Sequence, residues 1–178
     1  VYSPKGKNTG SAVVVFPGGG YYVLAIDLEG TEVCDWLTSK GITCVLLKYP
    51  VPNSGMHGDG RRQIKPKAPM ALEDAQRTVG LVRLHAAEYY IDPNKIGIMG
   101  FSAGAELSAP SAVLFEDFDK KNSDATDPLA GISSRPDFVG IVYPGPSPFA
   151  RSRPPPTIPP NAPPAFLVCG GAGDRGHT

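Results

Sequence analysis

Five runs of the sequence are apolar almost throughout, and helix-like segments separate the first three of them. The runs are "SAVVVF", "ITCVLLKY", "KIGIM", "DFVGIVYP" and "AFLVCG", at residues 11–16, 42–49, 95–99, 137–144 and 165–170. Strands without a polar face occur in parallel sheets that helices cover on both sides. The pattern therefore predicts an α/β fold, a mostly parallel central sheet between two helical layers.

The connecting segments have the spacing of amphipathic helices. Residues 29–41 and 70–90 place apolar side chains every three or four positions, and the first of these segments ends on a glycine, a common helix terminator. A third helix is expected over residues 103–115. Pro110 within it has no amide to donate, so we expect that helix to bend or to end early.

The length of 178 residues fits one domain with a substantial core. We assign residues 1–178 to a single α/β domain, with residues 144–164 as a proline-rich loop insertion because they hold half of the 20 prolines. Residues 50–69 form a second long loop rich in turn residues. The sequence begins with Val1 and not with methionine, so we expect the domain to be incomplete at this end.

Charge and hydropathy restrict the class of partner. The formal net charge is +0 and the isoelectric point is about 7.0, which gives no electrostatic basis for binding nucleic acid or an anionic membrane. No stretch approaches the roughly 18 to 20 apolar residues of a membrane span. We expect a neutral or weakly charged small molecule as the partner.

The three cysteines, Cys34, Cys44 and Cys169, form no Cys-x-x-Cys pair. Each lies in an apolar or helical pattern, so we expect buried free thiols. A bridge between Cys34 and Cys44 is the alternative.

A serine stands between glycines at the end of the third apolar run. Residues 96–107 read "IGIMGFSAGAEL", and residues 100–104 have the form Gly-x-Ser-x-Gly. A strand that passes through this pentapeptide into a helix forms a nucleophile elbow, where only small residues fit beside the serine. The same pentapeptide also occurs in ordinary turns, but its place between a strand and a helix favours Ser102 as a nucleophile.

The first apolar run ends in a loop that contains Gly18, Gly19 and Gly20. Acyl transfer by a serine requires fixed donors for the oxyanion, and glycine amides carry no side chain that obstructs a carbonyl oxygen. The amide of Ala103 is the expected second donor. Asp174 follows the last apolar run, in the order serine, aspartate, histidine. The alternatives are a flexible glycine loop and a solvated aspartate.

Four stretches together resemble the α/β-hydrolase superfamily. They read "VVVFPGGGYY", "LEGTEVCDWLTSKGITCVLLKYPVP", "ALEDAQRTVGLVRLHAAEYYIDPNKIGIMGFSAGAEL" and "RPDFVGIVYPG". Within the superfamily, the sequence is most similar to the acetyl xylan esterase and feruloyl esterase-like carboxylesterases of bacteria, from about residue 10 to residue 174. The resemblance implies a three-layer α/β-hydrolase sandwich.

The resemblance also implies an activity and its residues. Ser102 would be the nucleophile, Asp174 the triad acid, and Gly19, Gly20 and Ala103 the oxyanion contributors. The implied reaction is hydrolysis of a short-chain ester, with an acetyl or aromatic acyl group on a small molecule or on a polysaccharide such as xylan. It needs no metal and no organic cofactor.

The sequence departs from the resembled family at several positions. Pro17 stands where many relatives have histidine, and residues 105–107 read Ala-Glu-Leu where relatives read Gly-His-Leu. The family's catalytic histidine follows one more strand after the aspartate, whereas this sequence ends at Thr178. We therefore expect the base, the last strand and the last helix to lie outside these 178 residues.

Three histidines are present, at positions 57, 85 and 177. His177 is the alternative base because it is close to Asp174 in the chain. His57 is expected to be an ordinary loop residue, and His85 a residue on the surface of a helix.

Two other functions stay open: a non-catalytic ligand-binding protein with the hydrolase fold, and the catalytic domain of a prolyl oligopeptidase-type serine peptidase. A secreted or periplasmic location is expected if the substrate is a plant polysaccharide, and a cytoplasmic one otherwise. The oligomeric state is not encoded in any of these patterns.

Overall fold

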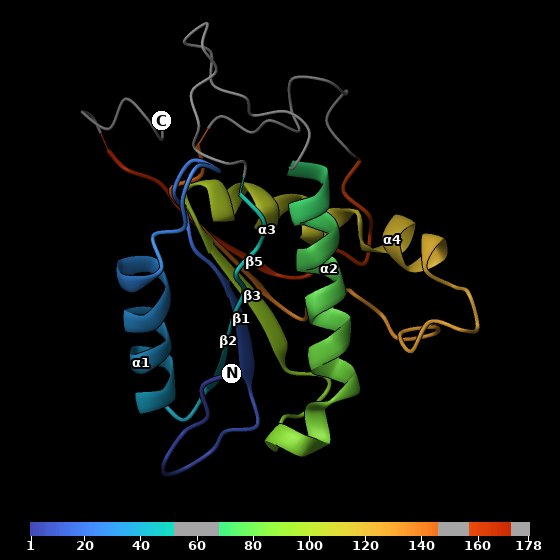
Figure 1. The fold of residues 1–178 in the computed structure, drawn as a ribbon, viewed down its shortest axis with the longest axis horizontal. Helices are drawn as coiled ribbons and strands as arrows, with labels where there is room; N and C mark the ends of the chain where they lie inside the picture. Colours follow the sequence, from blue (N-terminus) through green and yellow to red (C-terminus); the bar gives the residue numbers. More distant parts are fainter. Residues whose placement is uncertain (52–67, 146–156, 172–178) are drawn as a thin grey trace, which may run out of the picture.

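The computed structural model describes residues 1–51, 68–145 and 157–171, and its central element is a parallel sheet (Figure 1). Five strands lie in the order β2-β1-β3-β4-β5, each parallel to its neighbours. Their bounds are Ala12–Phe16 for β1, Thr43–Leu46 for β2, Ile96–Phe101 for β3, Val139–Val142 for β4 and Ala165–Val168 for β5. The predicted parallel sheet is confirmed, and β3, which leads into the serine pentapeptide, is its middle strand.

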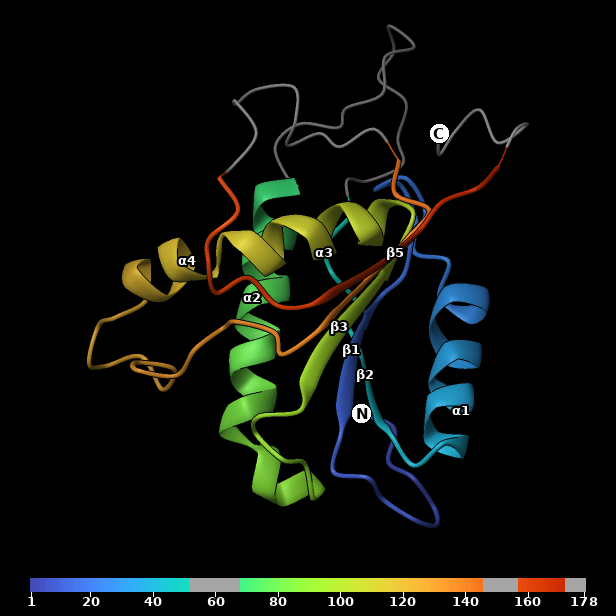
Figure 2. The same ribbon diagram turned by 180° about the vertical axis from the view of Figure 1, so that it is seen from behind.

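Helices lie on both faces of the sheet, as the predicted fold class requires, but they leave the edge strand β5 uncovered, and all four of its residues are exposed. One face carries α1, and the other carries α2 and α3, with α4 beside them; the view from behind in Figure 2 shows the same two layers. The bounds are Asp27–Thr31 for the π-helical turn η1, Glu32–Ser39 for α1, Ala68–Leu84 for α2, Ala86–Tyr89 for the 3-10 turn η2, Ala103–Val113 for α3 and Phe115–Lys121 for α4.

Strand β1 separates two apolar cores. Val13 and Val15 pack with Leu37 of α1, whereas Val14 and Phe16 belong to the core under α2 and α3. All five residues of β1 are buried. A strand covered on both faces has this composition, so the apolar run read from the sequence has its physical reason here.

Helix α3 does not end at Pro110. It continues to Val113, and the amide of Leu114 donates to the Pro110 carbonyl at 2.8 Å. Proline at this place removes one helical hydrogen bond, the one that an amide would give to the carbonyl of Glu106. The helix thus ends early, at Val113 and not at the expected Phe115, but about one turn after the proline, and α4 begins directly after Leu114.

Two of the three cysteines form a disulfide. Cys34 of α1 and Cys44 of β2 are bonded, with their Cα atoms 5.2 Å apart, and both are fully buried. Cys169 is free and exposed. The prediction of buried free thiols is wrong for Cys34 and Cys44, and for Cys169 it is right about the free thiol and wrong about its burial. The bridge held as the alternative is present, because α1 packs on β2 and brings its inward-facing cysteine onto the strand.

Reduction of this disulfide is expected to lower the free energy of unfolding by about 2 to 3 kcal/mol, because the bridge restricts the unfolded chain. The two cysteines are 10 residues apart in the sequence. Urea unfolding with and without dithiothreitol measures the change. The Cys169→Ala variant should respond to reductant as the wild type does, whereas Cys34→Ala/Cys44→Ala should not respond. A wild-type value independent of reductant would contradict the bridge.

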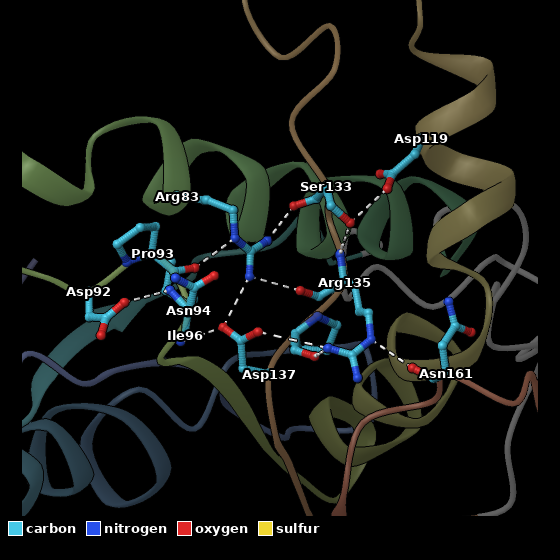
Figure 3. A network of polar contacts seen from close by, with 11 residues as sticks. Arg83, Asp92, Pro93, Asn94, Ile96, Asp119, Ser133, Arg135, Asp137 and Asn161 are labelled. Atoms are coloured by element: carbon cyan, nitrogen blue, oxygen red, sulfur yellow. Dashed lines mark hydrogen bonds and ion pairs between the residues drawn. The ribbon is translucent and has the colours of Figure 1, made fainter.

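A polar network ties the amino ends of β3 and β4 to the last turn of α2 (Figure 3). It lies at the amino end of β3, whereas Ser102 follows the carboxyl end of that strand. Arg83 donates to the carbonyls of Pro93 and Arg135, both at 2.9 Å, and contacts the Asp137 carboxylate at 3.2 Å. Asp137 also accepts from the amide of Ile96 at 2.8 Å. These contacts fix the position of the amino end of β3. Because Ser102 follows the other end of the same strand, they also help to fix the position of Ser102.

The two predicted long loops are described only at their margins. Residues 52–67 of the first, and 146–156 of the proline-rich segment, lie outside the described residues. Among the helices that the structure does describe, none combines the length and the apolar character needed to cross a bilayer.

Candidate active site

Ser102 lies in the sharp turn between β3 and α3, with φ 47° and ψ −115°. Its amide donates to the carbonyl of Val142 at 3.0 Å, and its carbonyl accepts from the amide of Glu106 at 3.2 Å. A positive φ strains a residue that has a side chain, and such strain clusters at functional sites. The predicted turn at the carboxyl end of a central strand is confirmed.

The glycines on either side of the serine are required by close packing. A Cβ atom on Gly100 would overlap the carbonyl of Gly104, and a Cβ atom on Gly104 would overlap the carbonyl of Phe16. Two backbone segments therefore approach each other with no space for a side chain. The spacing of the pentapeptide thus has a steric origin.

The glycine loop after β1 rests directly on this turn. A Cβ atom on Gly18 would lie 2.8 Å from the Cβ atom of Ser102 and 2.7 Å from the carbonyl oxygen of Phe101. Gly19 has φ 124° and Gly20 has φ 61°, in the region that favours glycine. The loop and the serine are therefore neighbours, as the oxyanion hypothesis requires.

Some backbone amides beside Ser102 have no hydrogen-bond acceptor among the described residues. The carbonyls of Gly18 and Gly19 accept from amides further along the loop at 3.0 to 3.3 Å. Within the described ranges, the amides of Gly19, Gly20 and Ala103 have no acceptor. Such amides beside a serine are suited to bind an oxyanion. Their convergence on one point near the Ser102 hydroxyl stays a prediction.

Three side chains that sequence analysis did not single out hold the loop in place. The Glu29 carboxylate accepts from the amide of Gly18 at 2.6 Å and from the Tyr143 hydroxyl at 2.9 Å. The buried Tyr49 donates its hydroxyl to the Pro17 carbonyl. These partners are 11 to 114 residues apart in the sequence, and no local motif marks them.

Glu106 is buried in α3 beside two tyrosines. Burial raises the pKa of Tyr21, and the negative charge of Glu106 raises it further. Burial also raises the pKa of Tyr49, and the charges of Glu29 and Glu106 add to this effect. Both hydroxyls therefore stay neutral in the folded protein well above the pH at which an ordinary tyrosine ionises.

A family model with the description BD-FAE matches residues 1–141. The chain belongs to the BD-FAE family. Its fold is that of the α/β-hydrolases, as the resemblance noted in the sequence implied.

Relatives of this BD-FAE chain include esterases and a xylanase. An acetylxylan esterase of Xylanibacter ruminicola is 38% identical over 101 residues, 57% of this chain and 18% of that protein. Endo-1,4-beta-xylanase B of Butyrivibrio fibrisolvens is 33% identical over 132 residues, 74% of this chain and 19% of that protein.

A solved structure is also similar to this BD-FAE chain. It is an acetyl ester-xyloside bifunctional hydrolase from Caldicellulosiruptor lactoaceticus, with a TM-score of 0.63 and 35% identity. The match covers 80% of this chain and 47% of that one. The BD-FAE chain therefore spans less than half the length of each of these three proteins.

The structure brings together four of the residues that the sequence singled out. The carboxyl ends of β1 and β3 in this BD-FAE chain are followed by Gly19, Gly20, Ser102 and Ala103. Among the described residues, no group of three or more histidine, cysteine, aspartate or glutamate side chains is placed to hold a metal ion.

Of the histidines and the predicted triad acid, the structure describes only His85. Asp174, His57 and His177 lie outside the described residues. His85, the one histidine in the described part of the BD-FAE chain, is partly exposed, and its Nδ1 is 2.6 Å from the Glu88 carboxylate. It lies in the turn between α2 and η2, at the amino-terminal end of the sheet strands, so the predicted place on a helix is wrong by one residue and His85 does not reach Ser102.

The buried tyrosines should make the BD-FAE chain sensitive to alkali. Unfolded tyrosines ionise near pH 10.0, whereas Tyr21 and Tyr49 stay protonated at higher pH in the folded state. The unfolded state loses protons first, so stability is complete below about pH 9 and falls as pH rises through 10, by up to about 1.4 kcal/mol per pH unit for each tyrosine.

Urea unfolding at pH 9, 10 and 11 measures this slope. Tyr49→Phe should reduce the slope, and Tyr90→Phe, at an 82% exposed position, should not. An unfolding free energy that is constant between pH 9 and 11 would refute the prediction.

Proposed function

We infer that this chain is the catalytic part of a serine carboxylesterase that hydrolyses short-chain acyl esters through an acyl-enzyme. The observation that carries this inference is the strained Ser102 turn packed against the Gly18 loop, with amides on both sides that have no acceptor among the described residues. Membership of the BD-FAE family and the esterase names of two of the three relatives described above support it.

The geometry suggests the following chemistry. The Ser102 hydroxyl attacks the ester carbonyl carbon while a base takes its proton, and the carbonyl oxygen becomes an oxyanion. The amides of Gly19 or Gly20 and of Ala103 donate to that oxyanion. Collapse of the intermediate expels the alcohol, which receives the proton from the base. Water, deprotonated by the same base, then releases the acid and restores the serine.

The base and the triad acid are proposed from chain order. Asp174 follows β5, and in this architecture the acid comes after the serine and before the histidine. We propose Asp174 as the residue that orients a histidine base located after it in the chain. His177 is one candidate for that base, and a His177→Ala variant of the full-length enzyme distinguishes it from a histidine on another loop.

The substrate class is proposed from the relatives. Two proteins similar to this chain have acetyl esters in their names, and one of these names also specifies xylan. We therefore propose acetyl esters, including acetyl groups on a xylan-type polysaccharide, with aromatic acyl esters as the second choice.

A series of p-nitrophenyl esters tests the acyl preference. The full-length enzyme should have its highest kcat/KM with acetyl to butyryl esters, and about tenfold or more lower values with octanoyl and longer chains, because we propose a site that fits short acyl groups. Acetate release from acetylated xylan is the matching assay on polymer. Faster hydrolysis of long-chain esters would overturn the short-chain proposal.

A further inference from the structure

Glu29 connects three segments that meet at the serine turn. Its Oε2 accepts from the amide of Gly18 at 2.6 Å, and its Oε1 accepts from the Tyr143 hydroxyl at 2.9 Å. Tyr143 follows β4, and its ring packs on Phe101, the residue before the serine, at 5.9 Å between ring centres. Both carboxylate oxygens are thus engaged by groups that border Ser102.

The two peptide units on either side of the Gly18 Cα atom are both held by hydrogen bonds. The Gly18 carbonyl accepts from the amide of Ala25 at 3.0 Å, and the preceding carbonyl, of Pro17, accepts from Tyr49. Of the hydrogen-bonding groups from the Pro17 carbonyl to the Gly19 carbonyl, only the Gly19 amide lacks a partner among the described residues. The Gly18 amide therefore already donates to Glu29, whereas the amides of Gly19 and Gly20 remain available to donate to a ligand.

Local backbone geometry brings Glu29 to this place. It lies in the π-helical turn η1, where the amide of Thr31 donates to the carbonyl of Ile26 at 2.8 Å. Gly30 is buried next to it, and a Cβ atom there would lie 3.6 Å from the Pro17 ring. The turn therefore packs directly on the loop, and single π turns of this kind are frequent at functional sites.

We propose that Glu29 is a positioning residue: it fastens the Gly18 peptide against the serine turn, and thereby fixes the direction of the Gly19 and Gly20 amides that receive the oxyanion. The proposal rests on the proposed esterase function of Ser102. A hydrogen bond from an amide to a carboxylate is short and strong. Its loss would let the loop amides move, and a displacement of about 1 Å at a reacting site can cost about a hundredfold in rate.

The tests use kinetic variants of the full-length enzyme with p-nitrophenyl acetate. Glu29→Ala should lower kcat by about tenfold to a hundredfold and leave KM within about threefold, because oxyanion donors act on the transition state. Glu29→Gln keeps an oxygen for the Gly18 amide and should recover most of kcat. Glu32→Ala, which removes an exposed carboxylate from the first turn of α1, is the matched control and should stay within about twofold of the wild type.

A tetrahedral analogue separates positioning from mere stability. The inhibition constant of a trifluoromethyl ketone should rise in Glu29→Ala by the same factor by which kcat/KM falls, and Tyr143→Phe should show a smaller change in the same direction. If Glu29→Ala does not fold, Tyr143→Phe decides, because it keeps the ring on Phe101 and removes one of the two hydrogen bonds.

Three outcomes would overturn the proposal: wild-type kcat in Glu29→Ala, equal loss in the alanine and glutamine variants, or wild-type kinetics in Tyr143→Phe when the alanine variant is unfolded. Titration of the wild type with a fluorophosphonate tests the proposed esterase function independently of the Glu29 variants. An enzyme that is labelled and active, yet indifferent to Glu29, refutes the positioning role alone. An enzyme that is neither labelled nor active refutes the proposed function and the positioning role with it.

Discussion

Ser102→Ala is expected to lower kcat for ester hydrolysis by about a millionfold, because the hydroxyl oxygen is the atom that forms the acyl-enzyme bond. The backbone hydrogen bonds of this residue, with Val142 and Glu106, do not involve the side chain. The variant keeps both backbone bonds, so we expect it to fold. Residual activity is measured with p-nitrophenyl acetate, and stability is measured by urea unfolding.

A glycine at the same position separates strain from chemistry. Ser102 has φ 47°, which glycine adopts without strain, so Ser102→Gly should be about 1 kcal/mol or more stable than the wild type and equally inactive. This result would show that the strained turn is maintained at the expense of stability. Substantial turnover in either variant, above about 1% of wild type, would remove Ser102 from the role of nucleophile.

The second large effect concerns Gly104, two residues after the serine. Gly104→Ala should lower the free energy of unfolding by about 3 kcal/mol or more, because the new methyl group would overlap the carbonyl of Phe16 and lie 2.8 Å from that of Pro17. Phe16 ends the fully buried strand β1, so its backbone cannot move aside without disturbing the sheet. The fraction folded as a function of urea concentration gives the loss, and failure to obtain folded protein is the extreme form of the same result.

Gly6→Ala is the matched control for this substitution. A Cβ atom on Gly6 meets nothing within 4 Å, so stability should change by less than about 0.5 kcal/mol. A Gly104→Ala variant as stable as Gly6→Ala would mean that the serine turn does not pack on β1 as described.

The sheet was predictable because its signal is local. Each strand is a short apolar run, and β1 is buried on both faces, so composition alone indicates a covered parallel sheet. The ends were less accurate: the run at residues 42–49 contains only four strand residues, Thr43–Leu46. The segment at 29–41 was read as one helix, whereas its beginning is the π turn η1 and α1 starts at Glu32. The spacing of apolar residues does not distinguish a π-helical turn from an α-helical one.

Long-range contacts explain the errors and omissions. The Cys34–Cys44 bridge depends on α1 packing over β2, which spacing along the chain does not reveal. In the site, Ser102 and its glycines carry a local motif and were found from the sequence. Glu29 and Tyr143, which are 114 residues apart, carry none, and only the fold shows that they meet.

Covalent labelling of Ser102 tests the central claim most directly. The full-length protein is treated with a fluorophosphonate and examined by intact-mass and peptide mass spectrometry, beside Ser102→Ala. We expect one label per chain, located on the peptide that contains residues 100–104, and none in the variant, because only an activated serine reacts. Absence of label from the folded wild type, or equal labelling of Ser102→Ala, would contradict the account.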